Sequence, residues 1–289
     1  MNETLITADG RSILRFERRL AHPVEKVWRA VTDPAHLSQW FPSDMDLDLQ
    51  PGGKIRFVFR DGEGPTLDGT ITDLDPPTVF AYTWGDSHLR FELWPDGDGC
   101  LLIFTHTFDD RPSAASFAAG WYTCLKALAM VLDGKPIEVS DEWAELHESY
   151  VEAFGLLEGT VEETPGGWTV RFERQLTRPV AQVWAVLAGT PADAPAAGEP
   201  APPPSTSGHA PAGAITSVEP PALLEYQWLY EDEPVGQVRW ELSDGPGGAR
   251  LVLTQTVPAR LPDHRYTALT AWRTHLKRLA GRLRAGSCG

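Results

Sequence analysis

Residues 13–42 read ILRFERRLAHPVEKVWRAVTDPAHLSQWFP, and this stretch decides the fold. Apolar and polar residues alternate in its first part, as they do in a strand with one buried face. From residue 24 to residue 31 the apolar residues recur at three- and four-residue spacing, which is typical of one face of a short helix. Asp33 is suited to cap a second short helix that begins at Pro34. The predicted order is strand, helix, helix and an aromatic corner at residues 40–42.

A second version of this stretch returns at residues 169–187 as TVRFERQLTRPVAQVWAVL, so the chain is expected to contain the same unit twice. The comparison also indicates which strand face is buried. Glu225 stands where the first half has Ala81, and burial of an unpaired Glu is costly. The opposite face, which carries Phe80, Tyr82 and Trp84, is therefore predicted to be the inner one.

Further strand-like runs follow the aromatic corner and are separated by turn residues. They lie at residues 44–49, 54–60, 66–74, 79–84, 88–94 and 100–108. From Ser113 the spacing becomes helical, with Phe117, Trp121 and Leu125 on one stripe, and Gly134 ends the helix. A matching stripe in the second half places Trp272 where the first half has Trp121. Each half is expected to consist of antiparallel strands followed by one long helix.

Four segments of the first half together resemble one known family. They read VWRAVTDPAHLSQWFP, QPGGKIRFVF, GTITDLDPPTVFAYTW and GWYTCLKALAMVLDGKP. In this order they are similar to the Hsp90-ATPase-activator-homologue group of the START-like (SRPBCC) superfamily. The resemblance implies an α+β helix-grip fold of the START/Bet v1 kind, in which a curved antiparallel sheet wraps around a long C-terminal helix and encloses a cavity.

The expected organisation is an intact START-like domain at residues 1–156, a linker at 157–167 and a reduced START-like domain at 168–289. The second copy is reduced because a Pro/Ala-rich segment at about residues 188–212 replaces the second short helix, the aromatic corner and two strands. Such a composition buries little apolar surface, so we expect this segment to be disordered. Ligand binding is then expected of the first domain, with the second acting as a scaffold.

Composition excludes several classes of partner. A formal net charge of −15 with no basic stripe argues against binding to nucleic acid or to an anionic membrane. The acidic surface is interpreted as a solvated face, with an acidic docking face for a basic partner as the alternative. The N-terminal residues lack the pattern of a signal peptide, and three cysteines are too few for a disulfide framework or a metal site. A cytoplasmic protein without cofactor or metal is expected.

Candidate ligand-binding residues are the aromatic and polar side chains that the alternation and the corner place on the inner side of the first domain. They are Arg18, Trp40, Phe41, Phe57, Phe59, Tyr82, Trp84, Phe91, Phe104, His106 and Trp121. His106 is either a hydrogen-bonded histidine near a strand end or the polar group that orients a ligand. Arg18 either reaches the rim with its stem against the core or anchors an anionic ligand group.

The leading function is binding of a small apolar or aromatic molecule in the first domain. The family name provides an alternative, a protein-interaction module that stimulates the ATPase of an Hsp90-type chaperone. A third possibility is an enzyme similar to the polyketide cyclases of the superfamily, for which His106 and Tyr82 are the acid–base pair that we nominate. The sequence contains no nucleophile triad, metal-ligand cluster or phosphate loop, which favours a binding protein over an enzyme.

Overall fold

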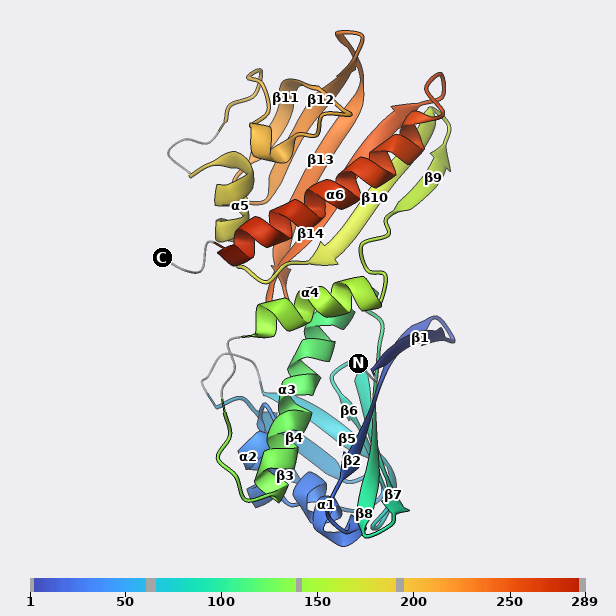
Figure 1. The fold of residues 1–289 in the computed structure, drawn as a ribbon, viewed down its shortest axis with the longest axis vertical. Helices are drawn as coiled ribbons and strands as arrows, with labels where there is room; N and C mark the ends of the chain where they lie inside the picture. Colours follow the sequence, from blue (N-terminus) through green and yellow to red (C-terminus); the bar gives the residue numbers. More distant parts are fainter. Residues whose placement is uncertain (1–2, 61–65, 139–141, 191–194, 286–289) are drawn as a thin grey trace. The chain divides into compact units, whose positions relative to one another are not determined.

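The computed structural model describes residues 3–60, 66–138, 142–190 and 195–285 of the chain. The chain divides into two compact units, Met1–Trp143 and Ala144–Gly289. Each unit is an α+β fold in which a long helix packs on one face of an antiparallel sheet (Figure 1). The predicted fold class, two helix-grip units of which the second is reduced, is confirmed.

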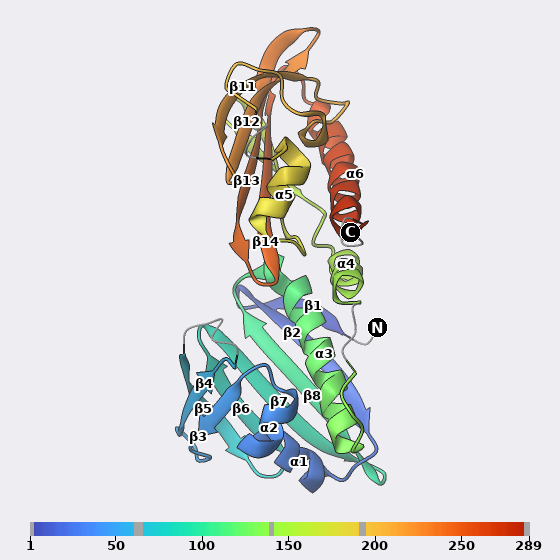
Figure 2. The same cartoon turned by 90° about the vertical axis from the view of Figure 1, so that its left-hand side faces the viewer.

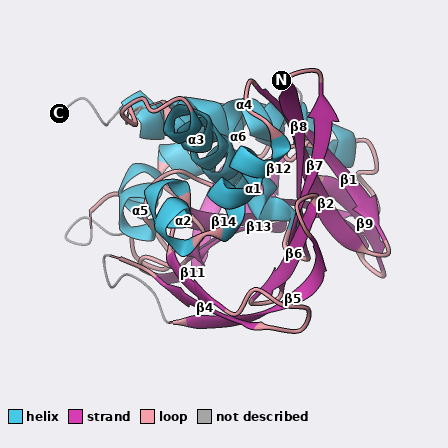
Figure 3. Ribbon diagram, turned by 90° about the horizontal axis from the view of Figure 1, so that it is seen from below, coloured by secondary structure: helices cyan, strands magenta, loops and turns pink. Residues whose placement is uncertain are grey.

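The first unit contains an eight-stranded sheet in the order β1-β2-β8-β7-β6-β5-β4-β3. Its strands are β1 (Thr4–Ala8), β2 (Arg11–Leu20), β3 (Asp44–Leu47), β4 (Lys54–Val58), β5 (Leu67–Asp75), β6 (Val79–Trp84), β7 (Ser87–Asp96) and β8 (Gly99–Phe108). Its helices are α1 (Val24–Thr32), α2 (Pro34–Trp40), the short η1 (Arg111–Ser113) and α3 (Ala114–Leu132). The three α-helices lie on the same side of the sheet (Figure 2, Figure 3).

The inner face of this sheet is the one that the alternation predicted. Every second residue is buried along β7 (Leu89, Phe91 and Leu93) and β8 (Leu102, Phe104 and His106). In β6 the inner residues Phe80 and Tyr82 are buried, and so is the small Ala81 between them. Helix α3 covers this face with Trp121, Leu125 and Leu128, which are also buried. Burial of one large apolar side chain contributes roughly 1.5–3 kcal/mol, so this layer is the main source of the unit's stability.

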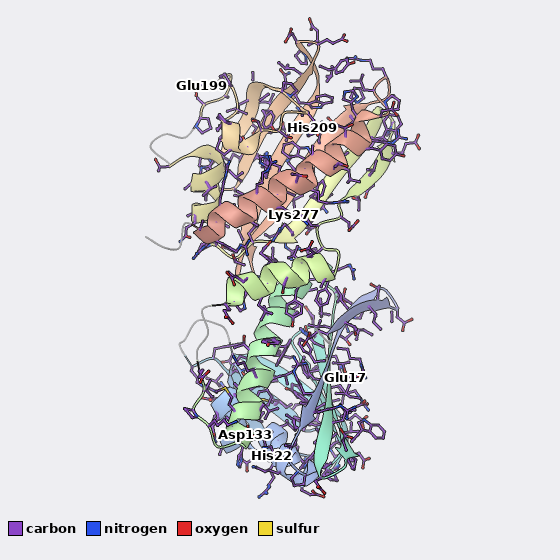
Figure 4. All side chains as sticks on the ribbon, in the orientation of Figure 1. Glu17, His22, Asp133, Glu199, His209 and Lys277 are labelled. Carbon is purple, nitrogen blue, oxygen red and sulfur yellow. The ribbon has the colours of Figure 1, made fainter. Side chains whose placement is uncertain are left out.

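The end of α3 is tied to the start of α1. The Lys26 amine donates a hydrogen bond to the Leu132 carbonyl at 2.6 Å, and His22 Nε2 lies 2.8 Å from the Asp133 carboxylate (Figure 4). Among the described residues, the stretch Arg111–Leu132 is the one helix that is long and apolar enough to cross a membrane, and half of its most apolar part is buried inside the protein. Its apolar character is therefore explained by its place as the core helix of the unit.

The second unit contains a six-stranded sheet in the order β11-β12-β13-β14-β10-β9. Its strands are β9 (Thr160–Thr164), β10 (Gly167–Gln175), β11 (Ala212–Glu219), β12 (Leu223–Tyr230), β13 (Glu233–Gly245) and β14 (Gly248–Pro258). Its helices are α4 (Trp143–Ala153), α5 (Val180–Ala188), the short η3 (Pro203–Ser205) and α6 (His264–Ala285). In the part that the structure describes, strands equivalent to β3 and β4 are missing, as the sequence predicted.

The boundary between the units lies near Trp143 rather than at residue 156. Helix α4 belongs to the second unit because Glu148 pairs with the buried Arg174 of β10, and Glu152 lies 3.2 Å from Lys277 of α6 (Figure 4). The expected linker at 157–167 also contains strand β9, which pairs with β10. The apolar residues of α4 recur at helical spacing from Trp143 to Phe154, whereas β9 is short and mostly exposed, so no alternation of buried residues marks it in the sequence.

The segment that we expected to be disordered is ordered at residues 195–212, whereas residues 191–194 lie outside the described part. Ser205 is fully buried, and its carbonyl accepts hydrogen bonds from the Tyr226 hydroxyl at 2.9 Å and from the Trp240 indole at 3.0 Å. The Pro204 carbonyl lies 2.9 Å from His275 Nε2. Proline loses little conformational entropy when it becomes ordered. Because the two carbonyls also accept hydrogen bonds, this segment is ordered although it buries little apolar surface.

Candidate ligand-binding site of the first unit

The aromatic residues predicted for the site form one continuous cluster, which we call the aromatic cluster. Its members are Trp40, Phe41, Phe57, Phe59, Tyr82, Trp84, Phe91, Phe104 and Trp121. Trp121 of α3 lies at its centre, with ring centroids 4.5 Å from Phe104, 5.7 Å from Phe41 and 5.8 Å from Trp84. Helices, strands and the corner after α2 therefore converge on the inner side of the sheet.

The corner after α2 is fixed by local sequence. The Asp33 carboxylate accepts a hydrogen bond from the backbone N–H of Ala35 at 2.8 Å and caps α2, which begins at Pro34. The Trp40 indole donates to the Ala30 carbonyl at 2.9 Å, which holds the end of α2 against α1. Phe41 is extended, as expected for a residue that precedes proline, and it turns into the cluster.

A single row across three strands carries the polar side chains of the site. Tyr82 in β6 pairs in register with Leu89 in β7, which pairs with His106 in β8. Neighbouring strands are about 4.8 Å apart, so the backbones of Tyr82 and His106 are separated by roughly 10 Å on the same face. Two polar groups thus flank an apolar strip beneath α3.

The hydrogen bond between Trp121 and His106 fixes the state of the imidazole. The Trp121 indole N–H donates to His106 Nδ1 at 3.1 Å, so Nδ1 carries no proton. Burial lowers the pKa of His106 to about 3, and the ring is therefore neutral at pH 7 with its proton on Nε2. In this arrangement His106 offers a hydrogen-bond donor to the cluster and not a proton acceptor.

Two buried donors of the aromatic cluster, and one of His106 beside it, have no hydrogen-bond partner among the described residues. They are the Tyr82 hydroxyl, the Trp84 indole N–H and the His106 Nε2–H. Burial raises the pKa of Tyr82 well above its usual value, so this hydroxyl keeps its proton. A buried donor without a partner costs about 1–3 kcal/mol, so each of these three groups requires an explanation.

Two buried serine hydroxyls of the first unit were not predicted from the sequence. Ser43 follows the aromatic corner and Ser116 lies in the first turn of α3; both are buried, and their hydroxyls have no partner in the described ranges. The only sequence signal for Ser43 is its place directly after Pro42. For Ser116 the helical stripe provides no signal, because serine is not counted among the apolar positions.

Arg18 has an anionic partner within the chain. Its guanidinium lies 2.6 Å from the Glu3 carboxylate and over the rings of Phe16 and Tyr122, with 22% of its side chain exposed. This arrangement agrees with the interpretation in which the stem lies on the core and the charge reaches the rim. Within the described ranges, no group of three or more His, Cys, Asp or Glu side chains is placed to hold a metal ion.

The second unit has the same row with different partners. Tyr226 in β12 pairs with Val238 in β13, which pairs with Gln255 in β14. Whereas the Tyr82 hydroxyl has no described partner, the Tyr226 hydroxyl donates to the Ser205 carbonyl at 2.9 Å. The Gln255 amide oxygen accepts from the Trp272 indole at 2.6 Å, as His106 accepts from Trp121. In the second unit the chain thus supplies an acceptor to the Tyr226 hydroxyl, whereas the Gln255 amide nitrogen has no partner among the described residues.

Another part of the same loop reaches Gln255. His209 Nε2 lies 3.0 Å from the Gln255 amide oxygen, and its ring packs edge-on against Trp272 of α6 (Figure 4). Trp228, at the position of Trp84, donates to the Thr256 carbonyl at 2.8 Å. The donors of this unit at the Tyr82 and Trp84 positions are therefore both satisfied internally.

A family model described as Activator of Hsp90 ATPase homolog 1-like protein matches residues 21–133 and 197–284. One matched stretch falls within each unit, and together they cover more than half of the chain. The chain belongs to this family. The resemblance that the sequence segments indicated is therefore confirmed, and the activator-homologue match includes α1, α2 and α3 in the first unit.

Several solved structures are similar to this activator-homologue chain. CalU16 from Micromonospora echinospora is 26% identical, with a TM-score of 0.43, and the match covers 53% of this chain and 94% of that chain. A conserved protein of unknown function from Enterococcus faecalis, EF2215, is 22% identical, with a TM-score of 0.46 and coverage of 52% and 89%. MLL2253 from Mesorhizobium loti is 26% identical, with a TM-score of 0.39 and coverage of 43% and 98%. A comparison with curated proteins found no match.

Proposed function

We propose that the first unit binds a small apolar or aromatic molecule among the residues of the aromatic cluster, and that the second unit acts as a scaffold without a ligand of its own. The observation that carries the proposal is the set of three buried donors, on Tyr82, Trp84 and His106, that have no partner among the described residues. Aromatic walls with a few convergent polar groups are typical of small-molecule sites.

Packing supports binding among the rings of the aromatic cluster. The rings around Trp121 come from separate parts of the chain, so a guest that contacts them is surrounded on several sides. Apolar contact supplies affinity at roughly 25 cal/mol for each Å² buried, whereas the donors select the orientation. Arg18 is already paired with Glu3 and is therefore assigned to the rim rather than to the guest.

The test is a titration of the full chain with N-phenyl-1-naphthylamine, an uncharged aromatic probe, followed by the emission of the probe. Trp121→Phe is expected to weaken binding about five-fold, which corresponds to a loss of roughly 1 kcal/mol of ring contact. Trp272→Phe, at the equivalent place in the second unit, is the matched control and is expected to leave the Kd unchanged. Failure of the wild-type chain to bind the probe with a Kd below about 100 μM, which corresponds to roughly 5.5 kcal/mol, contradicts the proposal.

The family supports a second candidate, stimulation of the ATPase of an Hsp90-type chaperone. This function predicts faster ATP hydrolysis when the chain is mixed with such a chaperone. It also predicts that exposed charged residues such as Arg19, Asp96 and Arg60 matter more than the aromatic cluster. Stimulation that persists in Trp121→Phe but is lost on charge reversal at these positions would favour the chaperone role over ligand binding.

A cyclase-like reaction is less well supported by the geometry. The nominated pair Tyr82 and His106 presents two donors, and His106 acts as a base only if it releases the Trp121 indole and exchanges its proton.

We also propose a cytoplasmic location. Burial raises the pKa of the Cys124 thiol to about 12, and both Cys100 and Cys124 are free thiols. Free thiols are ordinary in a reducing compartment.

A further inference from the structure

We propose that the guest of the first unit presents a neutral carbonyl oxygen to the Tyr82 hydroxyl, as a ketone, ester or amide does, at the position where the second unit holds the carbonyl of its own Ser205. The inference rests on the proposed function, because it names the chemical class of the molecule bound among the aromatic cluster. Tyr82 is thereby assigned as a residue that determines specificity.

The equivalence of the two tyrosines follows from the sheets. Tyr82 and Tyr226 lie on the strands that follow β5 and β11, and each pairs in register with an inner aliphatic residue of the next strand, Leu89 or Val238. That residue pairs in turn with the polar residue, His106 or Gln255, that accepts a hydrogen bond from the central tryptophan of the long helix. Both tyrosine side chains are fully buried.

The second unit shows which group this tyrosine position binds. The Ser205 carbonyl is buried between the Tyr226 hydroxyl at 2.9 Å and the Trp240 indole at 3.0 Å. It is delivered by a chain segment that lies between α5 and β11. In the first unit the corresponding stretch of sequence forms α2, β3 and β4 instead, and the Tyr82 hydroxyl has no partner among the described residues. The tyrosine hydroxyl thus donates to a backbone carbonyl in the second unit, and in the first unit we infer that it donates to the ligand.

The charge of the site selects a neutral acceptor. Tyr82, Trp84 and His106 all offer donors that carry no formal charge, because the His106 ring is neutral. A buried carboxylate or phosphate requires a cation, since its desolvation costs several kcal/mol. The cation predicted for this purpose, Arg18, is already paired with Glu3. A carbonyl oxygen accepts hydrogen bonds without adding a charge, so it suits the three donors better than an anion does.

The test compares two probes of nearly the same shape, 2-acetylnaphthalene and 2-ethylnaphthalene, by equilibrium dialysis against the full chain. The ketone is expected to bind about three- to ten-fold more tightly, the range expected for one buried hydrogen bond. Tyr82→Phe is expected to abolish this preference, because only the ketone loses a hydrogen bond. Tyr226→Phe, the matched control in the second unit, is expected to retain the preference.

The outcomes separate this inference from the proposed function. If both probes bind the wild-type chain equally, or if the preference persists in Tyr82→Phe, the carbonyl inference is overturned and the proposed apolar site stands. If neither probe binds, the proposed function itself fails. Hydrogen exchange of strand β6 in Tyr82→Phe establishes that the variant is folded; the lost hydroxyl has no partner among the described residues, so the protection of this strand is expected to be retained.

Discussion

The two buried tyrosines allow a paired test of the structure in the absence of any ligand. Tyr226→Phe removes a hydroxyl that donates to the Ser205 carbonyl at 2.9 Å. Tyr82→Phe removes the equivalent hydroxyl of the first unit, which has no partner among the described residues. Both changes delete one oxygen from a fully buried ring and leave the apolar contacts in place. The two variants therefore differ mainly in whether a hydrogen bond is lost.

The expected magnitude follows from what remains after each change. In Tyr226→Phe the Ser205 carbonyl keeps the Trp240 indole as a donor at 3.0 Å, so the loss is the net value of one hydrogen bond, about 1 kcal/mol. This corresponds to about a five-fold change in the unfolding equilibrium and to roughly 2–4 °C in Tm for a unit of this size. Tyr82→Phe is expected to be neutral or stabilising by about 1 kcal/mol, because it removes an unsatisfied buried donor.

Native-state hydrogen exchange on the full chain measures both effects at once, because amides in β12 report on the second unit and amides in β6 on the first. Tyr226→Phe is expected to speed the slowest exchange in β12 about five-fold, with β6 unchanged. Tyr82→Phe is expected to leave the exchange of β6 unchanged or to slow it. Equal losses of protection in the two variants would refute the inferred difference between the two tyrosine environments.

Three further predictions address other parts of the chain. Glu148→Ala is expected to destabilise the second unit by about 3 kcal/mol, because it leaves Arg174 buried without a counter-charge, and a urea midpoint that does not move contradicts this. His106→Gln is expected to flatten the pH dependence of the first unit. The folded-state pKa of His106, about 3, lies below 6.5, so the unfolded state binds more protons and stability falls by about 1.4 kcal/mol per pH unit as the pH drops from 6.5 towards 3. Wild-type and variant chains with the same slope in this window would show that His106 does not titrate as described. Replacing residues 196–211 with a short Gly/Ser linker is expected to lower the Tm of the second unit by several degrees, roughly 2–4 °C for each kcal/mol of lost hydrogen bonding, as calorimetry can measure; an unchanged Tm would mean that the segment does not contribute to packing.

The sheet of each unit was predictable because strand alternation is a strong local signal. The presence of Glu225 at the position of Ala81 was enough to identify the inner face, and Phe80 and Tyr82 are indeed buried. The edge strands β1 and β9 were missed, since both are short and mostly exposed, and their order comes from pairing with β2 and β10. No alternation of buried residues marks such strands in the sequence.

The candidate site was predictable in its members but not in its chemistry. Alternation placed His106 and Tyr82 on the inner face, but only the position of the Trp121 indole reveals that Nε2 carries the proton of His106. In the same way, the partner of Arg18 is Glu3, a residue fifteen positions earlier that no pattern connects to it. Hydrogen-bond partners depend on three-dimensional distance, which residue spacing alone does not determine.

The order of residues 195–212 was wrongly predicted, because the prediction considered side-chain composition and not the hydrogen bonds of the backbone. The prolines and alanines of this loop bury little, yet the Ser205 carbonyl accepts from two buried donors and the Pro204 carbonyl accepts from the half-buried His275. If each of the three hydrogen bonds contributes about 1 kcal/mol, the bound conformation of the loop is more stable than the detached one by roughly 3 kcal/mol. The loop is then detached in about one molecule in 150. A guest that needs the same position then binds the second unit about two orders of magnitude more weakly than an open site. In the first unit the described chain places no acceptor on the Tyr82 hydroxyl, so a guest that binds there has no such competitor to displace. This difference in backbone acceptors, and not a difference in wall residues, is our reason for proposing the first unit as the one that binds.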